Sequence, residues 1–186
     1  MRIRRINLYG GPGSRKSTYA HGICNALKKE AIDIEFPTEI IKGWVYEKKM
    51  PKSYDEFYLI SKQMIEEDRF LRGGAEYVIC DAPLAIYAFY AKYYNFDYWN
   101  IMVDMVNHYD KCYKGLNIFI NVDRDSQDYN PLGRYQTKEE AKEADAQMLD
   151  FLTILYSDDL VILPQDEGIV SDYVFSALKI KARDVK

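Results

Sequence analysis

Residues 10–18 read Gly-Gly-Pro-Gly-Ser-Arg-Lys-Ser-Thr and follow the P-loop pattern G-x-x-x-x-G-K-S/T at every fixed position except one, where Arg15 replaces the second glycine. Residues 3–9 before it are apolar and β-prone, and apolar side chains recur at helical spacing over residues 17–29. A strand, a glycine-rich turn and a helix in this order are the context in which the pattern binds nucleotide phosphates. The chain is therefore expected to build an α/β fold around a phosphate-binding loop.

The residue types in this loop suit a nucleoside triphosphate. A loop poor in Cβ atoms lets backbone N–H groups approach the phosphates closely. We expect Lys16 to place its charge on the β- and γ-phosphates of ATP, and the Ser17 hydroxyl to hold the Mg²⁺ that bridges them. The predicted ATP-binding residues are Gly10, Gly11, Gly13, Ser14, Arg15, Lys16, Ser17 and Thr18.

The backbone conformation of Arg15 determines whether the loop is strained at this position. A positive φ at this position would strain an arginine by about 1 kcal/mol or more. A helical backbone would cost nothing and would leave the guanidinium beside the phosphates. We favour the helical conformation and a functional loop, while a loop that Arg15 disables, and that holds a nucleotide without turnover, stays open.

Composition limits the other classes of protein. A chain of 186 residues, 48% of them apolar, suits one domain with one core over residues 1–186. It holds no apolar run long enough to span a bilayer, and a cytoplasmic location is expected. The net charge of −4 argues against an extended basic surface for nucleic acid. Three widely separated cysteines suggest neither a disulfide framework nor a zinc site.

Strand and helix patterns alternate along the chain. Strands are expected at residues 3–9, 32–39, 76–82, 116–122 and 160–163, and helices at 17–29, 53–71, 84–94, 98–113, 137–156 and 169–180. Ser53 is the expected N-cap of the second helix, with Glu56 as its capping-box partner, and Thr137 opens a later helix with a similar signal. This order predicts a three-layer fold on a five-stranded parallel sheet, which binds ligands at the carboxyl ends of its strands.

Acidic residues end two of these strands. Asp81 is expected to coordinate Mg²⁺ through water or to act as a general base; the alternative is that it caps the helix after Pro83. Glu39 ends the second strand and is expected to bind a hydroxyl or a base of the acceptor, with a solvated turn carboxylate as an equal alternative.

A polar segment follows the fourth strand. Residues 124–145 are expected to form a lid, in which Arg134 stabilises the charge that phosphoryl transfer develops and Arg124 binds the substrate. A surface arginine is the alternative for each.

Tyrosine is unusually frequent, with 17 residues concentrated between positions 77 and 113. Spacings of three and four residues favour packing of these rings over base stacking. A homo-oligomer formed through the tyrosine-rich helices also stays open.

Three segments together carry a resemblance to a known family. They are the loop at 10–18, the strand end Cys-Asp-Ala-Pro-Leu at 80–84, and Tyr-Asn-Pro-Leu-Gly-Arg-Tyr-Gln-Thr-Lys-Glu-Glu-Ala at 129–141. They resemble small phage-encoded P-loop kinases that are related to the nicotinamide riboside kinase domain and often labelled AAA-type ATPases. The wider group includes kinases of 5-hydroxymethyluracil that act in the modification of phage DNA. Membership would place the protein in the host cytoplasm.

The resemblance implies a strand order of 2-3-1-4-5 and a helical lid. It also implies that Lys16 and Ser17 hold the phosphates and Mg²⁺, that Asp81 is the strand-end acid and that Arg134 is a lid arginine. The predicted function is an ATP-dependent kinase that phosphorylates a hydroxyl of a nucleoside, a nucleotide or a 5-hydroxymethyl pyrimidine in DNA. The acidic net charge favours a small acceptor or a single flipped base. The alternative is an ATP-binding NTPase or regulatory switch without a small-molecule acceptor.

Overall fold

The computed structural model of the chain describes residues 2–126, 129 and 135–180. The strands in these ranges are β1 (Ile3–Tyr9), β2 (Ile34–Glu35), β3 (Tyr77–Cys80), β4 (Lys114–Asn121) and β5 (Leu160–Pro164). The helices are α1 (Lys16–Lys29), α2 (Ile41–Tyr46), α3 (Asp55–Gly73), α4 (Leu84–Tyr93), α5 (Trp99–Cys112), α6 (Lys138–Tyr156), α7 (Glu167–Ala177) and the short 3-10 helix η1 (Ser157–Asp159). None of these helices combines the length and the apolar character that crossing a membrane requires.

The strands form one parallel sheet in the order β2-β3-β1-β4-β5, as the resemblance implied. The central strand β1 pairs on both sides, with Ile6 opposite Ile79 of β3 and Leu116 of β4. The chain passes from β1 to β2 and β3 on one side and later reaches β4 on the other. The carboxyl end of β1 is therefore the switch point of the topology, where open α/β sheets bind ligands.

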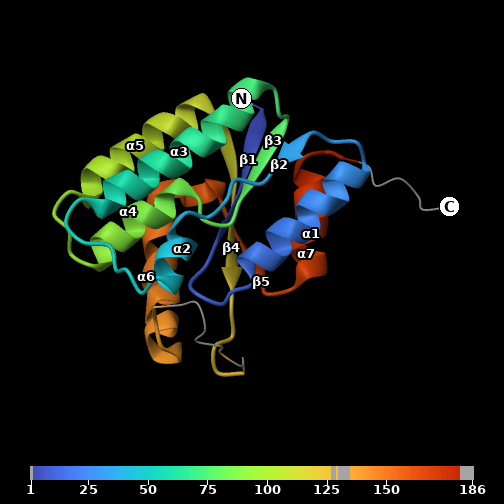
Figure 1. The fold of residues 1–186 in the computed structure, drawn as a ribbon. Coiled ribbons are helices and arrows are strands. Elements are labelled where there is room, and N and C mark those ends of the chain that lie inside the picture. Colours follow the sequence, from blue (N-terminus) through green and yellow to red (C-terminus); the bar gives the residue numbers. More distant parts are fainter. Residues whose placement is uncertain (1, 127–128, 130–134, 181–186) are drawn as a thin grey trace.

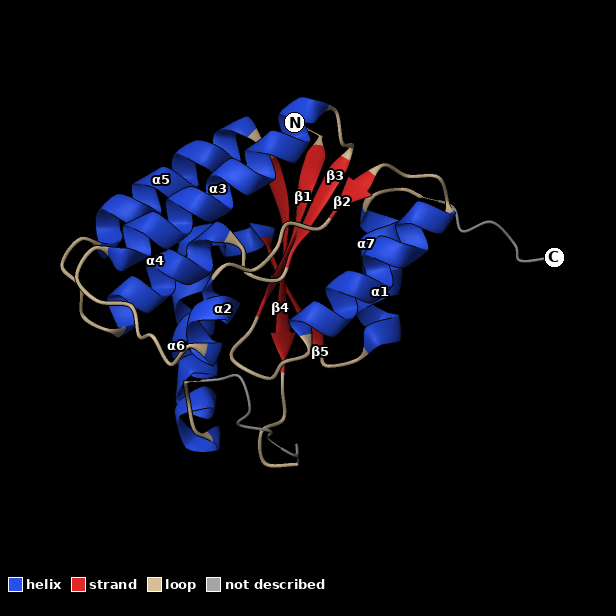
Figure 2. Ribbon diagram, in the orientation of Figure 1, coloured by secondary structure: helices blue, strands red, loops and turns tan. Residues whose placement is uncertain are grey.

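Helices cover both faces of the sheet (Figures 1 and 2). α1 and α7 lie on one face, and α3, α4, α5 and α6 lie on the other. The alternation of side chains along β1 supplies both cores: Ile6 and Leu8 pack with α1 and α7, while Tyr9 packs with the opposite helices. The predicted three-layer α/β fold is confirmed.

The region between β2 and α3 differs from the prediction. β2 contains only Ile34 and Glu35, although residues 32–39 read as a strand. Pro37 has no N–H to donate to a sheet ladder, so the chain leaves the edge of the sheet before this point. Glu39 consequently lies in a loop, and the short helix α2, which the sequence did not predict, follows it.

Of the two helix N-caps predicted from the sequence, the structure confirms one and contradicts the other. Thr137 caps α6 as expected: Glu140 N donates to Thr137 Oγ1 (3.2 Å), and Thr137 N donates to Glu140 Oε2 (2.7 Å). The prediction for Ser53 was wrong, since α3 begins at Asp55 and no side chain caps it. Ser53 itself has a φ of 50°. Glu56 therefore does not form the predicted capping box, and its side chain is buried.

Candidate active site

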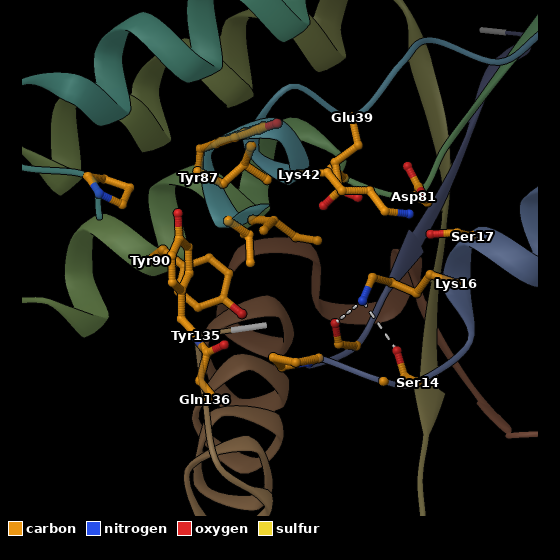
Figure 3. A pocket seen from close by; sticks show the side chains of 18 of the residues that line it. Ser14, Lys16, Ser17, Glu39, Lys42, Asp81, Tyr87, Tyr90, Tyr135 and Gln136 are labelled. Carbon is orange, nitrogen blue, oxygen red and sulfur yellow. Dashed lines mark hydrogen bonds between the residues drawn. The ribbon is translucent and has the colours of Figure 1, made fainter. Parts of the chain in front are cut away.

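A cavity of about 400 Å³ lies at the carboxyl ends of β1 and β3 (Figure 3). It is lined by the loop after β1, the loop before α2, α2 itself, the first turn of α3, one side of α4 and the residues just before α6. The polar side chains along it include Ser14, Arg15, Lys16, Ser17, Thr18, Glu39, Lys42, Glu56, Asp81, Tyr87, Tyr90, Tyr94, Tyr135 and Gln136.

Two glycines shape the loop for different reasons. Gly10 has a φ of 142°, which side-chain-bearing residues rarely adopt, and a Cβ there would lie 3.1 Å from the Ile120 carbonyl oxygen. A Cβ on Gly11 would lie 2.3 Å from Oδ1 of Asp145 on α6. The first glycine is thus required by the turn, and the second by close contact with a helix far along the chain.

Lys16 is held against the inside of this loop. Its Nζ donates to Gly10 O (2.7 Å), Gly11 O (3.1 Å) and Ser14 Oγ (3.3 Å). Burial lowers the pKa of Lys16, and the negative charges of Glu39 and Asp81 act in the opposite direction. The first turn of α1 and the Lys16 ammonium therefore face the same end of the cavity, an arrangement that suits the phosphates of a nucleotide.

Arg15 adopts the left-handed backbone conformation, which is the more strained of the two possibilities for an arginine. Its φ of 63° and ψ of 19° are left-handed, so the expectation of a helical backbone was wrong, and α1 begins one residue later at Lys16. The loop keeps the backbone path that a glycine would take, at a strain of about 1 kcal/mol for a side-chain-bearing residue. The exposed Arg15 side chain lines the cavity beside Lys16 and Ser17.

Replacing Arg15 by glycine is expected to raise the free energy of unfolding by about 1 kcal/mol, because glycine adopts a left-handed backbone without strain. Urea denaturation of Arg15→Gly and Arg15→Ala measures this, since alanine removes the guanidinium and keeps the strain. Arg15→Ala should match the wild type. A glycine variant no more stable than the alanine variant would show that the backbone strain is absent.

Asp81 and Glu39 both line the cavity. Asp81 is 4% exposed, and the alternative that it caps the next helix was wrong, because Pro83 is the N-cap of α4 and no side chain caps that end. Glu39 is partly buried rather than fully solvated. Burial, reinforced by the charge of Asp81, raises the pKa of Glu39 to about 7, while Lys16 and Lys42 oppose the shift.

The chemistry of Ser17 and Asp81 fits Mg²⁺. Both line the cavity and offer oxygen, the ligand atom that Mg²⁺ prefers, and Figure 3 shows them on the same side of it. Within the described ranges, no three His, Cys, Asp or Glu side chains form a metal cluster of their own. An ion held by a hydroxyl, one carboxylate and nucleotide phosphates needs no such cluster.

Arg124 lies outside the cavity lining. It is 3% exposed, and its Nε donates to Oδ2 of Asp145 (2.6 Å). The other oxygen of Asp145 accepts a hydrogen bond from Gly11 N (2.6 Å). Asp145, which no motif in the sequence indicated, therefore connects α6, the segment after β4 and the P-loop.

Arg134 lies outside the described residues, as does part of the predicted lid. Within the described part of that segment, Tyr135 and Gln136 line the cavity. The Tyr135 hydroxyl donates to the Lys49 carbonyl, and Gln136 Nε2 donates to the Tyr94 hydroxyl (3.2 Å). The residues before α6 thus contact both the α2–α3 connection and the residue that follows α4, at the edge of the cavity.

Tyrosines of α4 form the wall opposite the charged residues, as Figure 3 shows for Tyr87 and Tyr90. Tyr90 and Tyr94 are stacked, with ring centroids 5.9 Å apart and an angle of 19° between the rings. Tyr87 also belongs to the core on this face of the sheet. The predicted packing role therefore holds, and the same rings line the cavity.

Solved structures share this fold at low sequence identity. NadR protein in complex with NR has a TM-score of 0.69 and 15% identity, over 99% of this chain and 54% of that chain. NadR protein in complex with NAD and AMP-PNP has a TM-score of 0.70 and 14% identity, over 99% of this chain and 52% of that chain. Thymidylate kinase from Ehrlichia chaffeensis has a TM-score of 0.67 and 14% identity, over 97% of this chain and 100% of that chain.

These likenesses show the fold alone, which is the parallel sheet of order β2-β3-β1-β4-β5 with helices on both faces. The chain spans about half the length of the NadR chains that it matches. The sequence matches no protein-family model and no curated protein.

Proposed function

We propose that this protein is an ATP-dependent phosphotransferase that phosphorylates a hydroxyl of a nucleoside, a nucleotide or a 5-hydroxymethyl pyrimidine in DNA. The observation that carries the proposal is the continuity of the cavity, which includes the P-loop, Asp81, Glu39 and the tyrosines of α4. An enzyme that only hydrolyses ATP needs no more than room for a water molecule beside the phosphates, and this cavity is larger than that. An aromatic space of this size suits an organic acceptor.

The residues of the cavity suit in-line transfer. Asp81 orients the acceptor hydroxyl and takes its proton as the oxygen attacks the γ-phosphorus. A new O–P bond forms, the bond from the γ-phosphorus to the β–γ bridging oxygen breaks, and ADP leaves with that oxygen. Lys16 stabilises the charge that develops on the phosphate oxygens, and we assign the same role to Arg134. Mg²⁺, for which Ser17 and Asp81 supply ligands, neutralises phosphate charge when bound.

Glu39 is the second acid beside the acceptor. It lines the cavity near Asp81 and Lys16, whose charges act on its carboxyl. With a pKa of about 7, it is able to donate or accept a hydrogen bond near neutral pH. We assign it to the binding of an acceptor hydroxyl.

The size of the cavity and the net charge of −4 favour a small acceptor, or one base turned out of a strand, over a long nucleic-acid track. The transfer of label from γ-labelled ATP to nucleosides, nucleotides and 5-hydroxymethyluracil-containing DNA tests the proposal. Label on an acceptor, with ADP formed in proportion, is the expected result.

The other outcomes identify the alternatives. Free labelled phosphate without a labelled acceptor would indicate an NTPase. ATP binding without turnover would indicate a loop that Arg15 disables, in which case Arg15→Gly would gain activity.

A further inference from the structure

Two buried polar side chains line the cavity, and neither has a hydrogen-bond partner among the described residues. Glu56, in the first turn of α3, is 3% exposed, and no hydrogen bond or ion pair with another described residue holds its carboxyl. Tyr87, on α4, is 2% exposed, and its hydroxyl has no hydrogen-bond partner in the described part of the chain. Buried carboxyl and hydroxyl groups are nearly always hydrogen-bonded. A ligand in the cavity would supply what both groups lack.

Glu56 belongs to the aromatic end of the cavity. Burial raises the pKa of Tyr87, Tyr94 and Tyr135, which line the cavity, and the charge of Glu56 adds to the shift of each; Glu39 and Asp81 also act on Tyr87. The acids that act on Lys16 are instead Glu39, Asp81 and Asp145. The cavity thus has a phosphate end at Lys16 and a second polar end at Glu56, with tyrosine rings beside the second.

We propose that Glu56 and Tyr87 recognise the ring of the acceptor, and that this ring is aromatic and carries an N–H hydrogen-bond donor. The inference rests on the proposed function and names the substrate class of the same site. In its ionised form the Glu56 carboxyl only accepts hydrogen bonds, so an N–H donor on the ligand is the group that satisfies that form. The rings of Tyr90 and Tyr94 line the cavity, and an aromatic wall suits a planar ring.

Ligand binding should also release a proton. Burial, followed by the charge of Asp55 on the same helix, raises the pKa of Glu56 to about 8, so the free carboxyl is mostly protonated at neutral pH. An N–H donor favours the ionised form and lowers this pKa. The affinity should therefore rise with pH up to about 8 and then level off.

The tyrosines around Glu56 titrate above this range. The pKa values of Tyr94 and Tyr98 are raised to about 12, and those of Tyr87 and Tyr135 are also raised. Glu39 titrates near pH 7 at the phosphate end, so its contribution must be separated by a variant that changes only Glu56.

Matched nucleosides test the inference by calorimetry without ATP. The pairs are adenosine and purine riboside, cytidine and pyrimidin-2-one riboside, uridine and 3-methyluridine, and nicotinamide riboside and nicotinate riboside. At pH 7, in two buffers of different ionisation enthalpy, the wild type should bind the N–H-bearing member of at least one pair about tenfold more tightly or better, and should release protons. Glu56→Gln should lose the proton release and most of the preference, because its amide cannot ionise.

Glu66→Gln is the matched control, since Glu66 lies on the same helix, pairs with the exposed Arg69 and does not line the cavity. It should behave as the wild type, and thermal unfolding should show that both variants are folded. A preference or proton release that survives in Glu56→Gln, or no binding of any pair by the wild type, would overturn the inference. Failure of phosphate transfer alone would overturn the proposed function and leave a Glu56-dependent preference standing.

Discussion

Lys16→Ala is expected to lower the rate of phosphate transfer by about 10²- to 10³-fold, the usual effect of removing one charge-stabilising donor from a transfer site. The Lys16 ammonium is the cation that the P-loop holds directly, through the carbonyl oxygens of Gly10 and Gly11. Its removal leaves the backbone N–H groups of the loop in place but takes away the charge that meets the phosphates. The measurement is the steady-state rate with γ-labelled ATP on whichever acceptor the panel identifies.

Lys29→Ala is the matched control, because Lys29 is an exposed lysine at the other end of the same helix α1. It should retain the wild-type rate. Urea denaturation should show that Lys16→Ala remains folded, since the groups it loses as partners are turn carbonyls close to the cavity. A folded Lys16→Ala protein that transfers phosphate at the wild-type rate would contradict the assignment of this loop to catalysis.

The order of elements was predictable because it depends on local patterns. Strand and helix periods alternate, and glycine pairs such as Gly73 and Gly74 stop helices. Gly74 indeed has a φ of 112° at the end of α3. The prediction was wrong where a single residue overrides the local pattern. Pro37 ends β2 early, so Glu39 reaches the cavity from a loop instead of from a strand end.

Buried charges were the least predictable feature of the sheet. Residues 3–9 read as an apolar strand, yet Arg5 is fully enclosed on β1 and forms ion pairs with Glu67 on α3 (2.8 Å) and Asp110 on α5 (2.5 Å). Its partners are separated from it by 62 and 105 residues. No local spacing relates residues that meet only after the helices pack on the sheet.

The residues of the candidate site also divide into those that local sequence patterns indicate and those that only tertiary packing brings together. Lys16, Ser17 and Asp81 came from a motif and a strand end, and the structure places all three at one cavity. Glu56 was misread as a capping residue because Ser53 stands three positions before it. Its burial beside α4 depends on tertiary packing, as does the contact of Asp145 with Gly11. The end of the cavity around Glu56 was thus hidden from the sequence, while the end around Lys16 was not.

Asp81→Asn is expected to lower kcat by about 10²- to 10⁴-fold, which is the range that general-base catalysis contributes. Asparagine keeps the shape of the side chain but cannot take the proton of the acceptor hydroxyl. ATP binding measured without Mg²⁺ should change little, because Lys16 and the loop amides remain. Comparing kcat with this affinity separates a loss of chemistry from a loss of binding.

Glu39→Gln is the comparison that assigns the proton. Glu39 lines the same cavity, and its pKa of about 7 lets it compete with Asp81 for the role of base. If Asp81 is the base, Glu39→Gln should raise KM for the acceptor more than it lowers kcat, because it weakens a hydroxyl contact. A large fall in kcat for Glu39→Gln, with near-normal kcat for Asp81→Asn, would move the base to Glu39. The acceptor hydroxyl would then approach the γ-phosphorus from the α2 side of the cavity, where Glu39 and Lys42 lie.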